Sequence, residues 1–179
     1  IAGTGPLHAA LIEENLIARC GWHRVEEYFE CAGIKTHHNH DCLIRRNVLL
    51  DMIQASGIWM DYGNINSRCS QNLVIDTDSM FGGIFMEASQ APNLVDGNVI
   101  WGSTSNGIYQ HDCDFLTVAH NLIAHARRTG IRMQVCKGRI VFGRESTAIK
   151  NRVLNNIVVG CGEPVSISDP DNTCDGNLV

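Results

Sequence analysis

Charged residues are scarce in this sequence of 179 residues. Only 18% of the residues are charged, against about 25% in a typical globular domain, while 44% are hydrophobic. Much of the surface must therefore consist of Asn, Ser, Thr and Gly, a composition that suits stacked strands and uncharged polar ligands. The net charge of −5 leaves no basic field for a phosphate backbone, so we expect no nucleic-acid partner.

Long apolar runs are absent as well. No stretch approaches the roughly 18 apolar residues of a membrane span, so the sequence predicts no membrane partner. The start at Ile1 lacks the basic flank and the apolar run of a signal peptide. We interpret the chain as a segment of a longer bacterial protein, for which cytoplasmic and secreted locations both stay open.

The sequence contains no Cys-x-x-Cys pair among its eight cysteines, which argues against zinc-ribbon and thioredoxin motifs. We expect buried, reduced thiols, with structural disulfides as the alternative. The cluster HHNHD at 37–41 has the side chains of a metal site. Adjacent residues on a strand point to opposite faces, however, so we assign no metal ligands and no cofactor.

A repeat dominates what the sequence does contain. The dipeptide Gly-Ile recurs at intervals of 24, 26, 24 and 23 residues, starting at Gly33, Gly57, Gly83, Gly107 and Gly130. Each repeat also holds a short apolar run, usually opened by Asn, as at Asn47, Asn72, Asn98, Asn121 and Asn156. No interval leaves room for a crossover helix as well, which argues against a doubly wound α/β sheet. The repeat predicts an all-β fold, a right-handed parallel β-helix of the pectin-lyase-like type with about six to seven coils.

Stacking of the coils arranges equivalent residues in ladders. The inward ladders are expected to be Ile34, Ile58, Ile84, Ile108 and Ile131, and Thr36, Met60, Met86, Gln110 and Met133. The outward ladders are expected to be Lys35, Trp59, Phe85, Tyr109 and Arg132, and His37, Asp61, Glu87, His111 and Gln134. We expect the functional side chains to lie on the outward ladders.

Two stretches interrupt the repeat within a single β-helix domain spanning 1–179. The stretch at 20–32 has helix-like spacing of Val25, Tyr28 and Phe29, which predicts a short helix or lid. The stretch at 136–150 lengthens a later turn, and long loops on a solenoid commonly wall a binding cleft. Both ends lack the cap that a solenoid needs, so we expect further coils, a domain or a subunit to complete the cleft.

Two carboxylates, Asp61 and Glu87, occupy equivalent places in the phrases GIWMD and GIFME. Neighbouring strands lie about 4.8 Å apart, so stacking would bring the carboxyls within roughly 5 Å of each other. Retaining glycosidases hold two carboxyls about 5–5.5 Å apart. The pair is therefore our candidate catalytic pair, provided that no slip of register separates the two repeats.

Residues around the acids predict a sugar site. Large aromatic side chains suit the apolar face of a sugar ring, although aromatic stacks also stabilise β-helices without any ligand. The histidines could bind a carboxylate or a sugar hydroxyl, and the lysine could favour an ionised acid, although both types also occur as plain surface residues. The candidate substrate-binding residues are Lys35, His37, Trp59, Phe85, Tyr109, His111 and Arg132.

Several segments resemble the β-helix core of the bacterial β-xylosidases of glycoside hydrolase family 120. They are ECAGIK at 30–35, GIWMDY at 57–62, GGIFMEASQAPNLVDGNVIW at 82–101 and STAIKNRVLNNI at 146–157. The resemblance implies that Asp61 is the nucleophile and Glu87 the general acid/base. This chain is shorter than those enzymes, which carry extra coils and a β-sandwich domain, and it has Gln90 where many relatives have a histidine.

The sequence thus predicts a retaining glycoside hydrolase that acts on a plant or microbial polysaccharide or oligosaccharide, in a β-xylosidase-like manner. A carbohydrate-binding or structural β-helix without catalysis is one alternative. A polysaccharide lyase is another, although a calcium-dependent lyase would want more clustered acids than the pair at hand.

Overall fold

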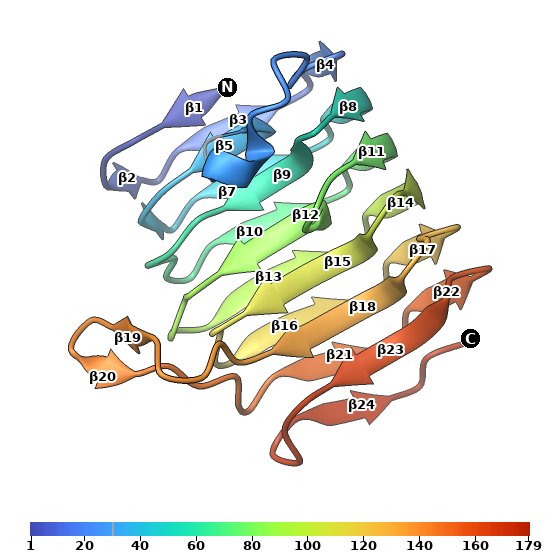
Figure 1. Ribbon diagram of the computed structural model, residues 1–179. Coiled ribbons are helices and arrows are strands. Elements are labelled where there is room, and N and C mark those ends of the chain that lie inside the picture. Colours follow the sequence, from blue (N-terminus) through green and yellow to red (C-terminus); the bar gives the residue numbers. More distant parts are fainter. Residues whose placement is uncertain (30) are drawn as a thin grey trace.

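The computed structural model describes residues 1–29 and 31–179, and the backbone but not the side chain of Tyr28. Three parallel sheets run along the molecule, and each full coil contributes one strand to each of them (Figure 1). The fold is therefore the predicted right-handed parallel β-helix. Each repeat holds three strands where the sequence pattern revealed two.

The strand bounds follow the repeat. The sheet that carries the Gly-Ile motifs consists of β1 (Ala2–Gly3), β5 (Ala32–Thr36), β9 (Ser56–Met60), β12 (Gly82–Glu87), β15 (Asn106–His111), β18 (Thr129–Gln134) and β23 (Glu163–Ile167). The second sheet consists of β3 (Leu11–Glu13), β7 (Leu43–Arg45), β10 (Arg68–Ser70), β13 (Asn93–Asp96), β16 (Leu116–Ala119), β21 (Arg152–Leu154) and β24 (Thr173–Asp175). The third consists of β4 (Leu16–Ala18), β8 (Val48–Ile53), β11 (Leu73–Asp78), β14 (Val99–Ser103), β17 (Leu122–Ala124) and β22 (Ile157–Val159).

The predicted isoleucine ladder is confirmed and forms the centre of the core. Neighbouring strands pair Ile34, Ile58, Ile84, Ile108 and Ile131 in series, and all five side chains are fully buried. Glycine precedes each of them because the chain has no room for a side chain there. A Cβ at Gly107 would lie 2.3 Å from Cγ2 of Ile123 and 2.7 Å from the carbonyl oxygen of Gly130.

The asparagines that open the apolar runs form a hydrogen-bonded ladder inside the turns. Asn72 Nδ2 donates to Asn98 Oδ1 at 2.9 Å, and Asn98 Nδ2 donates to Asn121 Oδ1 at 3.0 Å. Asn98 also donates to the carbonyl oxygens of Cys69 and Asp96. The ladder thus satisfies buried backbone groups at a tight turn, which would otherwise cost stability.

Both predicted insertions are structured where they are described. The first contains the 3-10 helix η1 (Glu26–Tyr28), as the sequence suggested, whereas Glu30, which belongs to this insertion and to the motif at 30–35, lies outside the described residues. The second forms an antiparallel hairpin of β19 (Ile140–Val141) and β20 (Arg144–Glu145), which projects from the side of the solenoid (Figure 1). A short parallel pair of β2 (Leu7–His8) and β6 (Asn39–His40) lies at a turn near the N-terminal end.

All eight cysteines are free thiols in the described part of the chain. Cys42, Cys69 and Cys113 are buried as predicted, but the prediction of burial is wrong for the other five. Cys174 is exposed, and the remaining four are half-buried. No helix among residues 1–29 and 31–179 has the length and apolar character needed to cross a membrane.

Candidate active site

Asp61 and Glu87 follow paired residues in consecutive coils. The register of β9 and β12 pairs Trp59 with Phe85 and Met60 with Met86, and the two acids are the next residue in each coil. The extra residues between the two Gly-Ile motifs are therefore absorbed in turns and cause no slip of register. Because neighbouring strands lie about 4.8 Å apart, the two acids come close together as the sequence predicted.

Asp61 is buried among hydrogen-bond donors. Its Oδ2 atom lies 3.1 Å from Nζ of Lys35 and 3.1 Å from Nε2 of His37, and its Oδ1 accepts the backbone N–H of Tyr62 at 2.7 Å. Lys35 is held in turn, because its ammonium lies 3.5 Å from the ring centre of Trp59 and donates to the carbonyl of Phe29. Lys35 and His37 thus hold the Asp61 carboxylate in place, and Phe29 of the lid holds Lys35.

Glu87 has a different environment. Its Oε2 accepts the indole N–H of Trp59 at 3.1 Å, and its Oε1 accepts Nη2 of Arg139 at 2.6 Å. Burial, and then the charge of Asp61, raise the pKa of Glu87, while His111 and Arg139 act to lower it. The net direction is upward, so Glu87 keeps its proton to a higher pH than a free glutamate.

The two acids face one cavity of about 530 Å³. Its volume falls within the roughly 300–1,000 Å³ of small-molecule sites. Coil residues form its floor, whereas Phe29 comes from the lid, and Cys136 and Arg139 come from the later insertion. The lining residues are Phe29, Lys35, Trp59, Asp61, Tyr62, Phe81, Glu87, Tyr109, His111, Cys136 and Arg139.

The aromatic ladder is more deeply buried than the sequence suggested. Trp59 is 1% exposed, Phe85 0% and Tyr109 8%, so the prediction of exposed aromatics is wrong. Phe81 covers them, with its ring stacked at 4.6 Å on Phe85 and at 6.0 Å on Tyr109. Trp59 and Tyr109 still line the cavity, whereas Phe85, which lies between them in the ladder and under Phe81, does not.

Two further candidates on the outward ladders differ in position, because His111 lines the cavity and Arg132 does not. His111 lines the cavity, with Nε2 3.9 Å from Glu87 Oε1 and Nδ1 2.8 Å from Asp112 Oδ2. Arg132 does not line it; its Nε donates to Gln134 Oε1 at 3.0 Å, and Gln134 Nε2 donates to the hydroxyl of Tyr109 at 2.6 Å. Arg132 therefore acts two contacts away from the cavity.

Sequence reasoning missed several residues of the cavity: Phe29, Tyr62, Phe81, Cys136 and Arg139. Arg139 is the most consequential of these, because it contacts Glu87 and also places Nη1 3.2 Å from Asp112 Oδ2. The only sequence signal for it was its place in the insertion at 136–150. Which of that insertion's basic residues turns inward could not be read from the repeat.

The chain matches a protein-family model. The model of the family described as "Periplasmic copper-binding protein (NosD)" matches residues 13–177. A comparison with curated protein sequences finds no match.

Among solved structures, the periplasmic alginate epimerase AlgG superimposes with a TM-score of 0.61 at 16% identity, over 83% of this chain and 42% of that chain. A double mutant of AlgG superimposes with a TM-score of 0.63 at 15% identity, over 99% of this chain and 46% of that one. The chain thus spans less than half the length of these structures, and the likeness shows the fold alone. A complex of XylC with xylose reaches a TM-score of 0.48 at 19% identity, over 86% of this chain and 28% of that one, which is too weak to argue from.

Proposed function

The chain belongs to the NosD family, and we propose that it is a retaining glycoside hydrolase whose catalytic pair is Asp61 and Glu87. One observation carries the proposal: two buried carboxylates stand at equivalent positions in adjacent coils, at one cavity, and each contacts different charged and polar groups. Asp61 has an ammonium against it, which suits an ionised nucleophile. Glu87 has a raised pKa, which suits a proton donor.

The proposed reaction has two steps. First, a carboxylate oxygen of Asp61 attacks the anomeric carbon while Glu87 gives its proton to the glycosidic oxygen, which leaves with the electrons of the broken C–O bond. Then Glu87, now ionised, takes a proton from water as that water attacks the same carbon and releases Asp61. Trp59 positions Glu87 through its indole N–H, and His37 positions Asp61.

Copper is named in the description of the family, and the residues here do not fit it. Within the described chain, His111, Asp112 and Cys136 bring three ligand atoms within 4.8 Å of one another. The guanidinium of Arg139 already lies 3.2 Å from both His111 Nδ1 and Asp112 Oδ2, so a positive charge stands beside the group. Burial and the charge of Asp112 raise the pKa of the Cys136 thiol, whereas a cysteine must lose its proton to bind a metal. The proposed reaction therefore uses no copper.

A second candidate is a lyase or epimerase that acts on a uronic acid polymer. Lys35 and Arg139 place two cations at the cavity, and such groups could neutralise a sugar carboxylate. Both cations are engaged by Asp61 and Glu87, however, and would have to exchange partners with the substrate. These two ion pairs therefore favour the hydrolase.

The proposed location is the periplasm, which the description of the family names.

The test is hydrolysis of a panel of para-nitrophenyl glycosides, beginning with the β-xyloside, by the protein and by Asp61→Asn and Glu87→Gln. Loss of either group should lower kcat/KM by about 10²–10⁴-fold. Asp96→Asn is the matched control, because this carboxylate pairs with Arg68 on the second sheet. Proton NMR of the first-formed sugar should show retention at the anomeric carbon.

Three outcomes would count against the proposal. Full activity in both acid variants excludes the pair. Inversion at the anomeric carbon excludes the nucleophile. An unsaturated product that absorbs in the ultraviolet, or a change of uronic acid stereochemistry without cleavage, assigns the site to the second candidate.

A further inference from the structure

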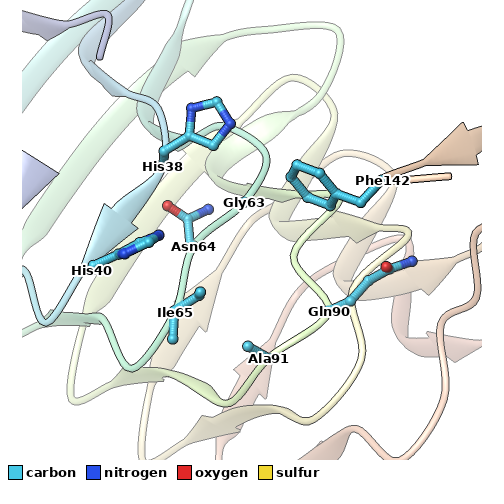
Figure 2. A pocket seen from close by; sticks show the side chains of 8 residues that line it. All are labelled: His38, His40, Gly63, Asn64, Ile65, Gln90, Ala91 and Phe142. Atoms are coloured by element: carbon cyan, nitrogen blue, oxygen red, sulfur yellow. The ribbon is translucent and has the colours of Figure 1, made fainter. Parts of the chain in front are cut away.

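A second hollow lies beside the catalytic cavity, at the turn where the coils leave the Gly-Ile sheet. It encloses about 370 Å³ and is lined in part by His38, Gly63, Gln90 and Phe142. Figure 2 shows His38 and Phe142 on opposite sides of the hollow, with Ile65 and Ala91 below them. Its volume lies within the range of small-ligand sites.

The same coils build the cavity and the hollow. In one coil, His37 contacts Asp61 and the next residue, His38, lines the hollow. In the next coil, Asp61 lines the cavity and Gly63 lines the hollow. Glu87 and Gln90 repeat this division in the third coil. The two sites are therefore in a fixed relation, set by the register of the solenoid.

The hairpin of the later insertion also serves both sites. Arg139, at its base, contacts Glu87, and Phe142, at its tip, lines the hollow. Tyr62 is the common wall: it lines the catalytic cavity, and its ring lies 4.6 Å from His38 and 5.8 Å from Phe142. Gly63 allows the His38 ring to pack closely against the backbone beside Tyr62, because a Cβ at this position would lie 2.5 Å from that ring.

The lining of the hollow combines an exposed aromatic face with polar groups. Phe142 is 62% exposed, and the imidazoles of His38 and His40 lie across from it. Gln90 accepts Nε–H of Arg144 on its Oε1 at 2.6 Å, which fixes the orientation of its amide. Its Nε2 donor has no partner among the described residues. An aromatic face with nearby donors and acceptors suits the ring and hydroxyls of a sugar.

We propose that this hollow binds the neighbouring sugar residue of a glycan chain whose reacting residue lies between Asp61 and Glu87. The inference rests on the proposed function for the kind of ligand in the cavity. It assigns a substrate of at least two sugar residues and explains the histidines of the 37–41 cluster without a metal. His37 serves the acid pair, while His38 and His40 serve the second sugar.

The experiment measures binding to the Asp61→Asn protein, which should hold glycans without turning them over. Isothermal titration with xylose, xylobiose and xylotetraose, and with the matching mannuronate series, yields the affinity ratio of disaccharide to monosaccharide. We expect a ratio of about ten or more in one series. A ratio near one in both series overturns the proposal.

Two variants in the Asp61→Asn background locate the gain. Phe142→Ala removes the aromatic face, and Ala91→Phe fills the hollow from its floor. Each should lower the ratio about five- to ten-fold, the scale of one lost ring contact. Phe115→Ala is the matched control, because this exposed phenylalanine lines neither the cavity nor the hollow, and it should leave the ratio unchanged.

The result separates the two proposals. A high ratio that both variants abolish supports the hollow even if no glycoside is hydrolysed. Hydrolysis of aryl glycosides with a ratio near one supports the acid pair and overturns the hollow. A high ratio that survives both variants places the second sugar elsewhere and also overturns it.

Discussion

The guanidinium of Arg139 lies 2.6 Å from Glu87 Oε1, although 52 residues separate the two along the chain. Arg139 belongs to the insertion that interrupts the repeat, and Glu87 belongs to the repeat itself. The insertion therefore reaches back over earlier coils and meets one acid of the pair. This contact places a positive charge beside Glu87 and lies at the base of the hairpin whose Phe142 lines the neighbouring hollow.

Replacing Arg139 by Met should raise the pKa of Glu87 further. Burial and Asp61 already raise it, and His111 and Arg139 oppose them, so the removal of Arg139 takes away one of the two groups that lower this pKa. The protonated acid then persists to higher pH, and the alkaline limb of the pH–rate profile should move upward. NMR titration of the Glu87 carboxyl carbon measures the same shift without any substrate.

Arg139→Lys keeps the charge and should leave most of the profile in place. Arg132→Met is the matched control, because Arg132 bonds to Gln134 and does not line the cavity. An alkaline limb that stays in place, or moves down, in Arg139→Met would contradict this account of Glu87.

Glu26 should anchor the lid most strongly at acid pH. Its buried carboxyl accepts the hydroxyl of Ser79 and the backbone N–H of Met80, the latter at 2.6 Å. Burial raises the pKa of Glu26, so its contribution to stability is fully present below about pH 4.5, the ordinary value, and declines as pH rises through the folded-state value. Glu26→Ala should cost about 1–3 kcal/mol at pH 4 and less at pH 8.

Urea unfolding at the two pH values measures this difference. Glu27→Ala removes an exposed neighbour of the same type and should change the free energy of unfolding by less than about 0.5 kcal/mol. A larger cost at pH 8 than at pH 4 for Glu26→Ala would contradict the direction of the pKa shift.

Substituting Ala for Gly107 should destabilise the middle of the solenoid. The added Cβ would meet the Ile123 side chain at 2.3 Å and a backbone carbonyl at 2.7 Å, so neighbouring coils would have to separate. We expect a loss of about 3 kcal/mol, at the upper end of overpacking. Gly5→Ala, where nothing lies within 4 Å, is the control for thermal unfolding. Equal midpoints in the two variants would show that the coils yield more easily than the contacts imply.

The repeat predicted the fold because each of its residues has a periodic role. Ile58 and Ile84 fill the same position in adjacent coils, and Asn72 and Asn98 bond to each other at the same turn. Such contacts depend on spacing, which a single sequence displays. The third strand of each coil has no such signal in the sequence, because segments such as β10 and β13 are short and lack a shared motif.

The candidate site was only partly predictable. Asp61, Glu87, Lys35, His37 and His111 were found because the ladder positions bring them together. Phe85 was misjudged because the ladder says that a side chain points outward but not that Phe81 will cover it.

By itself, the sequence determined the coil and its period and indicated the pairing of the two acids, since these follow from a spacing repeated along the chain. The register of the two coils came from the structure. Only the tertiary structure decided how the acids differ, which residues close the cavity and where the second hollow lies. Those features depend on where the lid and the hairpin fold back over the coils. Arg139 and Phe142 sit in a segment without periodicity, so their positions follow from contacts between distant parts of the chain.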